Sequence, residues 1–262
     1  MTLLLHELRR GRLMLAVFTG AIAFMLGICV VIYPEMAVEM AEVSNMFADM
    51  GAFSEAFGMD QLNFGEFMGY FGIECGNTLG LGGALFAALL GISALAKEEK
   101  DKTAEFLLTH PISRTRIVTE KLLAVLAELV IMNVGIAAVT LLAVAAVGVE
   151  AEIDTVLLLF LANLLMQIEI AAITFGISAF LHGGGLGIGL GIAFGLYFLQ
   201  ILANLIKQTE FLKFITPFAY TDGAHIVAEC SIEIKYLLTG LALTLVGIAA
   251  AYWQYRNKDI TS

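Results

Sequence analysis

The chain contains 262 residues, of which 60% are hydrophobic and only 15% are charged, whereas a typical soluble domain is about 45–50% apolar and about 25% charged. A soluble protein of this size cannot bury such an excess of apolar side chains, so the composition excludes a soluble enzyme, a disordered chain and a secreted disulfide scaffold. The net charge of −10 also excludes a nucleic-acid-binding protein, because an acidic chain is repelled by the phosphate backbone.

Six apolar runs are long enough to cross the hydrocarbon core of a bilayer, which takes about 20 residues of α-helix. The first run is too long for the apolar core of a cleaved signal peptide. The sequence therefore predicts an all-α polytopic membrane protein with six transmembrane helices in a single transmembrane domain, residues 1–262. The predicted spans are residues 13–33, 70–96, 121–148, 155–181, 186–206 and 236–255.

The basic residues predict the orientation of these spans. If both termini are cytoplasmic, eleven of the fourteen lysines and arginines lie inside, and only Lys207, Lys213 and Lys235 lie outside. The acidic residues show the opposite bias, since fourteen of the twenty-four fall in the predicted outer segments 34–69, 149–154 and 207–235. The positive-inside rule therefore predicts a multi-pass protein of the plasma (cytoplasmic) membrane with both termini in the cytoplasm.

Three segments outside the spans have predicted structures of their own. Residues 3–12 are typical of an N-terminal amphipathic helix on the cytoplasmic face. Residues 97–120 form the longest cytoplasmic loop, in which Pro111 should end a short helix and Ser113 should cap the third span. Residues 207–235 are too apolar for a solvated loop, and we expect a re-entrant outer segment broken at Pro217 or Gly223.

Polar side chains inside the spans predict either a path for a polar substrate or hydrogen bonds between helices. A charged or amide group in the membrane is costly, so each should face a cavity or a partner. The candidate path residues are Glu128, Asn133, Asn163, Gln167 and Glu169. Stripes of small residues at four-residue spacing, such as Gly183, Gly187, Gly191 and Gly195, predict close helix packing either within one subunit or between two.

The sequence contains no pattern for chemistry of its own. It has no Gly-Lys pair and hence no Walker A motif, and its histidines and cysteines have no metal-ligand spacing. His182-Gly183-Gly184-Gly185 resembles an esterase oxyanion loop, but no G-x-S-x-G nucleophile accompanies it. We therefore expect no catalytic residue, no metal and no cofactor bound by this chain.

The predicted cytoplasmic loop resembles a known family. Residues 98–114 read E-E-x-x-x-T-x-E-x-L-L-x-x-P-I-S-R, which is similar to the pattern E-E-x-x-G-T-x-E-x-L-L-x-x-P-I-S-R in permease subunits of type-2 ATP-binding-cassette (ABC) exporters. Lys102 stands where the family usually has glycine. Weaker resemblances over residues 7–10, 216–222 and 257–260 extend the similarity along the whole chain.

The resemblance implies a function and a set of partners. It implies a permease subunit without enzymatic activity, which forms the translocation path of an ATP-driven exporter with a second, identical or different permease. Residues in the loop would form a coupling helix that docks on an ATPase subunit, present in two copies and binding the ATP. The implied coupling residues are Glu98, Glu99, Thr103, Glu105, Leu107, Leu108, Pro111 and Arg114.

Other interpretations of these residues remain open from the sequence alone. The charged loop residues could instead anchor the loop to lipid headgroups and to one another. A secondary transporter could use Glu169 or Glu128 as a proton site, although the six spans show no clear internal repeat. An intramembrane enzyme lacks a convincing nucleophile or metal set. Nothing in the sequence identifies the substrate.

Overall fold

The computed structural model describes residues 2–48, 62–101 and 112–258, together with the isolated residues 51, 54 and 56. These residues form helices and no strand, and six of the helical segments are long and apolar enough to cross a membrane. The predicted all-α polytopic fold is therefore confirmed. The long helices are α1 (Thr2–Ala48), α7 (Arg114–Val147), α8 (Ile153–Ser178), α9 (Leu186–Leu205) and α11 (Ile234–Asn257).

The second span consists of three consecutive helical pieces, α3 (Phe67–Cys75), the π-helix η1 (Gly76–Leu81) and α4 (Gly82–Ala94). Shorter elements connect the spans at both ends of the bundle. They are α5 (Lys97–Lys100), the 3-10 helices η2 (Lys207–Phe214) and η3 (Pro217–Thr221), and α10 (Gly223–Glu229).

Local sequence signals explain where several helices begin and end. Ser113 caps α7 as predicted, because its hydroxyl accepts a hydrogen bond from the backbone N–H of Arg116 at 3.3 Å. Gly148 ends the same helix in the left-handed conformation (φ 75°), which glycine adopts without strain. Gly183 and Gly184 also have positive φ angles, so α8 and α9 are joined by a short turn.

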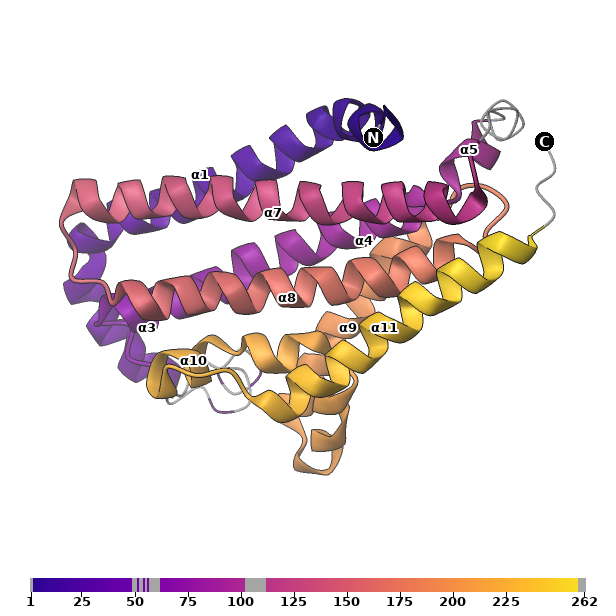
Figure 1. Cartoon of the computed structure of the whole chain (residues 1–262). Coiled ribbons are helices and arrows are strands. Elements are labelled where there is room, and N and C mark those ends of the chain that lie inside the picture. The colour runs from indigo at the N-terminus through magenta and orange to yellow at the C-terminus, as the bar shows by residue number, and fades with distance from the viewer. Residues whose placement is uncertain are drawn as a thin grey trace.

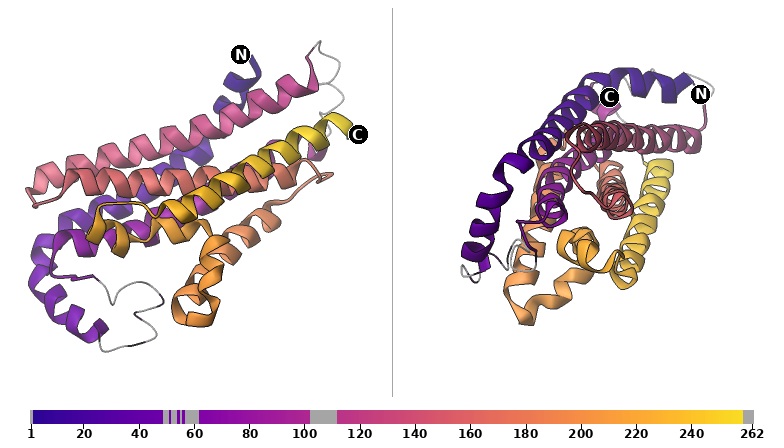
Figure 2. Two further views of the ribbon diagram at one scale, coloured as in Figure 1. Left: turned by 60° about the horizontal axis from the view of Figure 1, so that its bottom comes forward. Right: turned by 90° about the vertical axis from the view of Figure 1, so that its left-hand side faces the viewer.

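Helix α1 corrects the prediction of a separate N-terminal amphipathic helix. Residues 3–12 are helical, but they continue without interruption into the first span and beyond Pro34 to Ala48. A helix of 47 residues is about 70 Å long, more than twice the thickness of the hydrocarbon core. Figure 2 shows α1 curving along one side of the bundle. The amphipathic segment is thus continuous with the first span.

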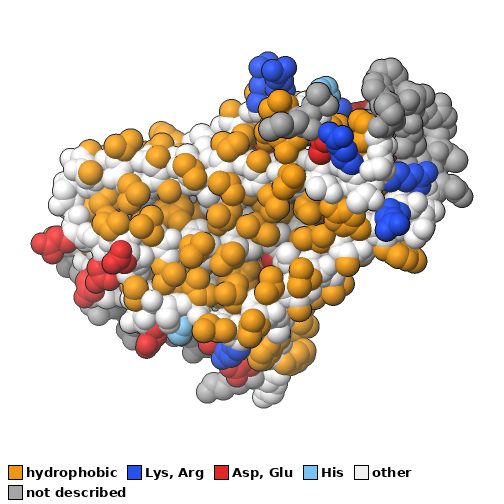
Figure 3. Space-filling model, in the orientation of Figure 1, with side chains coloured by type: hydrophobic (Ala, Val, Ile, Leu, Met, Phe, Trp, Pro, Cys, Tyr) orange, Lys and Arg blue, Asp and Glu red, His pale blue; other side chains and the backbone are white. Residues whose placement is uncertain are grey.

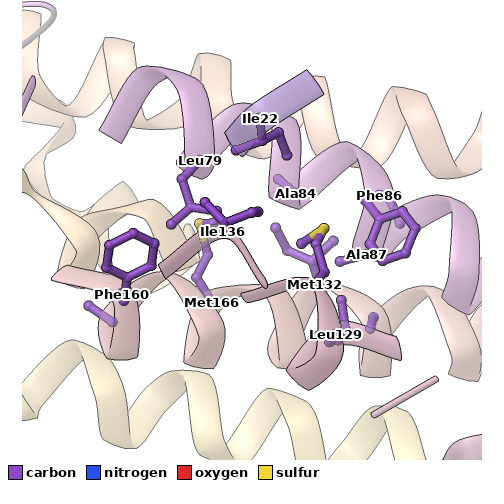
Figure 4. Packing of buried hydrophobic residues seen from close by; sticks show 14 of the residues in the cluster. Ile22, Leu79, Ala84, Phe86, Ala87, Leu129, Met132, Ile136, Phe160 and Met166 are labelled. Atoms are coloured by element: carbon purple, nitrogen blue, oxygen red, sulfur yellow. The ribbon is translucent and has the colours of Figure 1, made fainter. Parts of the chain in front are cut away.

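Helix α8 lies at the centre of the bundle. It packs against α4 on one side and α11 on another, and α7 also contacts it, whereas α1 packs chiefly on α7 (Figure 1). The second and fourth spans are accordingly the most buried, and the other four expose most of their surface. Figure 4 shows apolar side chains from α1, the second span, α7 and α8 meeting in the core, among them Ile22, Leu79, Met132, Ile136 and Met166.

The two ends of the molecule differ in charge. Figure 3 shows a broad hydrophobic surface with lysine and arginine side chains gathered at one end and acidic side chains gathered at the other. We call the first the basic end; it contains Arg9, Arg10, Arg114 and Arg256 and the C-terminal end of α4. We call the second the acidic end; it contains the α7–α8 connection with Glu150 and Glu152. The wide apolar band between them is that of a multi-pass membrane protein.

The segment between α9 and α11 is broken close to both predicted positions. Thr216 separates η2 from η3 and accepts a hydrogen bond from the backbone of Phe218, with Pro217 as the first residue of η3. Asp222 separates η3 from α10 and caps α10 through the backbone N–H of Ala224 at 3.0 Å. Residues Pro217–Thr221 are buried and contact α8, α9 and α11, so the segment turns into the bundle.

Candidate functional site

Three cations at the basic end bind the C-terminal ends of three helices. The ammonium of Lys121 donates a hydrogen bond to the carbonyl of Ala94 at the end of α4 (2.6 Å). Lys258 donates to the carbonyl of Leu181 just after α8. Arg114 donates to carbonyls at the end of α11. The last carbonyls of a helix have no partner inside the helix and carry a partial negative charge, so cations stabilise them.

These cations collect at one end because of the alternating direction of the spans. The second, fourth and sixth spans all run toward the basic end, so their carbonyl ends meet there. The lysines and arginines that the positive-inside rule places on one side of the membrane therefore lie where the C-terminal ends of three helices carry partial negative charge. The result is a fixed polar layer at the base of the bundle.

Lys121 forms the centre of this layer. Its side chain is only 1% exposed, and besides Ala94 it contacts the carboxylates of Glu98 and Glu7 (Glu7 Oε1 at 3.4 Å). Lys97 contacts the other oxygen of Glu7 at 3.2 Å. One buried ammonium thus connects α1, α4, α5 and α7. Two carboxylates and a carbonyl supply the charge and hydrogen bonds that a buried lysine requires.

Arg114 and Lys258 connect the chain on both sides of residues 102–111 to the end of α11. The Arg114 Nη1 donates to the carbonyls of Tyr255 (3.4 Å), Arg256 (3.2 Å) and Lys258 (2.6 Å). The Lys258 ammonium lies 2.7 Å from the Glu99 carboxylate. Residues 98–99 and residue 114 are therefore fixed to the bundle from opposite sides of the loop.

Three of the predicted ATPase-contacting residues have partners within this chain. Glu98 contacts Lys121, Glu99 contacts Lys258, and Arg114 donates to carbonyls at the end of α11. Their contact with an ATPase stays a prediction. Five further predicted coupling residues, Thr103, Glu105, Leu107, Leu108 and Pro111, lie outside the described residues, as does the predicted coupling helix beyond α5. Docking through those residues stays a prediction.

No pattern in the sequence directly indicates the roles of Lys121, Glu7 and Lys258. Lys121 ends the stretch that resembles the family and begins the third predicted span, and a lysine at the start of an apolar helix does not reveal which residues it contacts. Glu7 and Lys258 were parts of the weak terminal resemblances. Their partners are more than twenty residues away in the chain, and helical periodicity carries no information about such pairs.

The five candidate path residues do not lie together but occupy three different parts of the bundle. Asn133 on α7 donates to the side-chain oxygen of Gln167 on α8 at 2.6 Å, and both are buried. Asn163 is fully buried one turn away on α8 and donates to the Leu159 carbonyl at 2.9 Å. Gly83 of the second span faces Gln167 so closely that a Cβ at this position would collide with the Gln167 side chain. Each of these three amides takes part in a hydrogen bond inside the bundle, and each also has a buried polar atom without a hydrogen-bond partner among the described residues, namely Asn133 Oδ1, Asn163 Oδ1 and Gln167 Nε2.

Glu169 faces a different side of α8. Its carboxylate accepts a hydrogen bond from the Tyr220 hydroxyl of η3 at 2.9 Å, and a side chain on Gly240 of α11 would collide with it. Burial and the adjacent carboxylate hold the pKa of Tyr220 well above its ordinary value, so the phenol stays protonated and donates. Glu169 therefore ties the inward-turning segment to the central helix. This arrangement favours the hydrogen-bonding interpretation of the sequence for Glu169.

Glu128 lies apart from both groups, close to the basic end. It lines a cavity of about 340 Å³, whereas the amides and Glu169 do not line this cavity or the smaller one of about 80 Å³ near α10. Among the residues that the structure describes, no group of three or more His, Cys, Asp or Glu side chains is placed to hold a metal ion.

Comparison with known proteins identifies the family of this bundle. The sequence model of the ABC-2 family transporter proteins matches residues 1–260, which is nearly the whole chain. The chain belongs to the ABC-2 transporter family. As a member with six apolar helices it is an ABC permease, a transmembrane transport protein. No curated protein matches the sequence significantly.

Membership of the ABC-2 family agrees with the resemblance that the loop motif predicted. It places this permease among membrane components that associate with an ATPase subunit. At the basic end of this permease, α1, α4, α7 and α11 are joined by ion pairs and capped carbonyls.

Proposed function

We propose that this permease is the membrane-spanning subunit of an ATP-driven exporter, and that residues 102–111 dock on a separate ATPase subunit present in two copies. The ATPase binds and hydrolyses the ATP, and this chain has no enzymatic activity. The observation that carries the proposal is the fixation of the chain on both sides of these residues. Through Glu98–Lys121 on one side and Arg114 on the other, a displacement of the loop moves four helices together.

The proposal assigns docking on the ATPase and transmission of its movement to different residues. Glu105 and the apolar pair Leu107 and Leu108 supply the contact with the ATPase. Glu98, Glu99 and Arg114 are positioning residues that pass the movement to the bundle. A rigid link is required because packed helices shift as units and do not deform continuously.

The exporter further requires a second permease, and we propose that two copies of this chain meet along α9. Gly187, Gly191 and Gly195 lie on an exposed face of α9, and a Cβ at any of them would have no atom of its own chain within 4 Å. Glycine faces allow helices in membranes to approach closely. We place the basic end in the cytoplasm and the protein in the plasma membrane, in line with the positive-inside rule.

The test separates docking from transmission in the complex of this permease with its ATPase. Glu105→Ala should abolish co-purification of the two subunits without affecting membrane insertion. Glu98→Gln and Arg114→Gln should leave co-purification intact. They should instead remove the ATP-dependent fluorescence change of a dye attached to Cys230, which is exposed and lies just after α10 toward the acidic end.

Two outcomes would contradict the proposal. A permease that purifies with no ATPase, or that keeps its ATPase in the Glu105→Ala variant, would disprove docking through the loop. An unchanged ATP-dependent signal in both Glu98→Gln and Arg114→Gln would disprove transmission through the polar layer. Lys235→Gln is the matched control, because Lys235 is an exposed cation outside this layer.

A further inference from the structure

A cavity of the permease opens at the basic end. It has a volume of about 340 Å³ and lies between the first part of α1, the end of α4, the start of α7 and the turn before α9. Cavities of about 300–1,000 Å³ are typical of small-molecule sites.

The charged groups around this cavity are paired except at its inner end. Lys97 and Lys121 both contact Glu7, and Arg10 forms an ion pair with Asp101. Glu128 lies seven residues beyond Lys121 on α7, which places it about 10 Å deeper in the membrane. Its side chain is buried, and its Oε2 atom has no hydrogen-bond partner among the described residues.

The wall next to Glu128 is apolar and leaves it accessible from the cavity. Met14, Leu89 and Val125 line the cavity, and Leu186 at its mouth is 47% exposed. Gly11 faces the carboxylate so closely that any side chain there would collide with it. The site thus combines an acid that has one oxygen without a hydrogen-bond partner among the described residues with apolar side chains and an exposed leucine.

We propose that this cavity binds a cationic amphiphile, whose protonated amine pairs with Glu128 and whose alkyl chain lies along Met14, Leu89 and Val125. A buried carboxylate without a partner is costly, and a cation with N–H donors compensates both its charge and its lone pairs. The cations of the rim are neutralised by Glu7, Glu98 and Asp101, so an anionic headgroup has no free positive partner there. That the bound amphiphile is cargo rests on the proposed export function.

The experiment measures binding in the full-length permease alone, reconstituted in phosphatidylcholine nanodiscs. The probes are photoreactive derivatives of dodecylamine, dodecanol and dodecanoic acid, and mass spectrometry locates the labelled residues. We expect the amine to label peptides that contain Met14, Leu89 or Val125, with unlabelled dodecylamine competing. The alcohol and the acid should label these peptides at least about tenfold less, because a buried charge pair contributes more than a tenfold difference in affinity.

Two variants test the pairing from different sides. Glu128→Gln removes the charge, and Leu186→Lys places a cation at the exposed mouth while leaving Glu128 in place. Each should reduce amine labelling about tenfold or more. Glu74→Gln is the matched control, since Glu74 is another carboxylate in the spans that does not line the cavity.

Equal labelling by the three probes would overturn the proposal, as would amine labelling that Leu186→Lys and Glu128→Gln leave unchanged. If Glu128→Gln fails to fold, Leu186→Lys decides alone, because its position is exposed. The measurement needs no ATPase, so loss of docking in the earlier test and loss of binding in this one are independent results.

Discussion

Lys121 illustrates how a membrane protein keeps a charged side chain in its interior. The ammonium is donor to a helix-terminal carbonyl and lies against two carboxylates, Glu7 and Glu98, which come from segments far apart in the sequence. Removing one member of a buried ionic group leaves the others uncompensated, and this typically costs more than the group gained in forming. The loss of any one of these charged side chains should therefore destabilise the protein more than the intact group stabilises it.

We expect Lys121→Met to destabilise the permease by about 3–5 kcal/mol, because Glu98 and Glu7 would keep buried negative charge without their cation. The thermal unfolding midpoint of the purified protein in detergent measures this. Lys235→Met serves as control and should change stability by less than about 1 kcal/mol, since the Lys235–Glu233 pair is exposed. Similar midpoints for the two variants would show that the layer does not hold the basic end together.

Tyr220 and Glu169 allow a second test of a buried pair. We expect Tyr220→Phe to lower the free energy of unfolding by about 1–3 kcal/mol, because the Glu169 carboxylate loses its hydrogen-bond donor in a buried site. Adding Glu169→Gln should cost less in the Tyr220→Phe background than in the wild type, as a double-mutant cycle detects. Additive effects would mean that the hydroxyl and the carboxylate do not act as a pair.

The motif at residues 98–114 shows how far sequence can predict such sites. It predicted the family, and the match over residues 1–260 agrees. It could not predict that Glu98 and Glu99 face inward, because their partners Lys121 and Lys258 reach them only when α7 and α11 pack together. The same applies to Glu169, whose partner Tyr220 comes from a segment 51 residues away.

Among the helices, the six apolar runs predicted the spans well, but not where the helices end. Apolar composition reports what lies in the membrane, whereas a helix continues as long as its backbone hydrogen bonds are satisfied, as α1 does to Ala48. In the second span, small residues at four-residue steps (Gly72, Gly76, Gly80, Ala84 and Ala88) form a stripe that does not include Gly83 and Gly91, which face α8 closely. The π-helix η1 interrupts the regular repeat before them, so the stripe shifts to another face.

Helix α9 gives a matched pair of glycines for testing the proposed dimer. A Cβ on Gly189 would lie 2.7 Å from Ile92 Cγ2 and 3.0 Å from the Ala88 carbonyl of α4, whereas one on Gly191 would meet nothing in its own chain. We expect Gly189→Leu to impair folding of the subunit. We expect Gly191→Leu to leave the unfolding midpoint unchanged and to abolish the dimer, as cross-linking in membranes would show. A dimer that survives Gly191→Leu would place the interface elsewhere.

In the whole molecule, the distribution of charged residues agrees with the direction of the helices. The carbonyl ends of the second, fourth and sixth spans lie at the end where cations gather, so the same residues orient the protein and close its base. That base also holds the chain on both sides of the loop and surrounds the cavity with Glu128. Movement of the loop and access to the cavity are therefore mechanically linked in the proposed exporter.

The orientation itself can be tested with the native cysteines. Cys230 is exposed and follows α10 toward the acidic end, whereas Cys75 is buried and Cys29 is half-buried. We expect a membrane-impermeant maleimide to label Cys230 in intact cells. In a Cys230→Ala background, a cysteine introduced by Arg9→Cys at the basic end should be labelled only after permeabilisation. The reverse pattern would invert the topology, and the basic end could then not meet a cytoplasmic ATPase, because its loop would lie on the opposite side of the membrane from ATP.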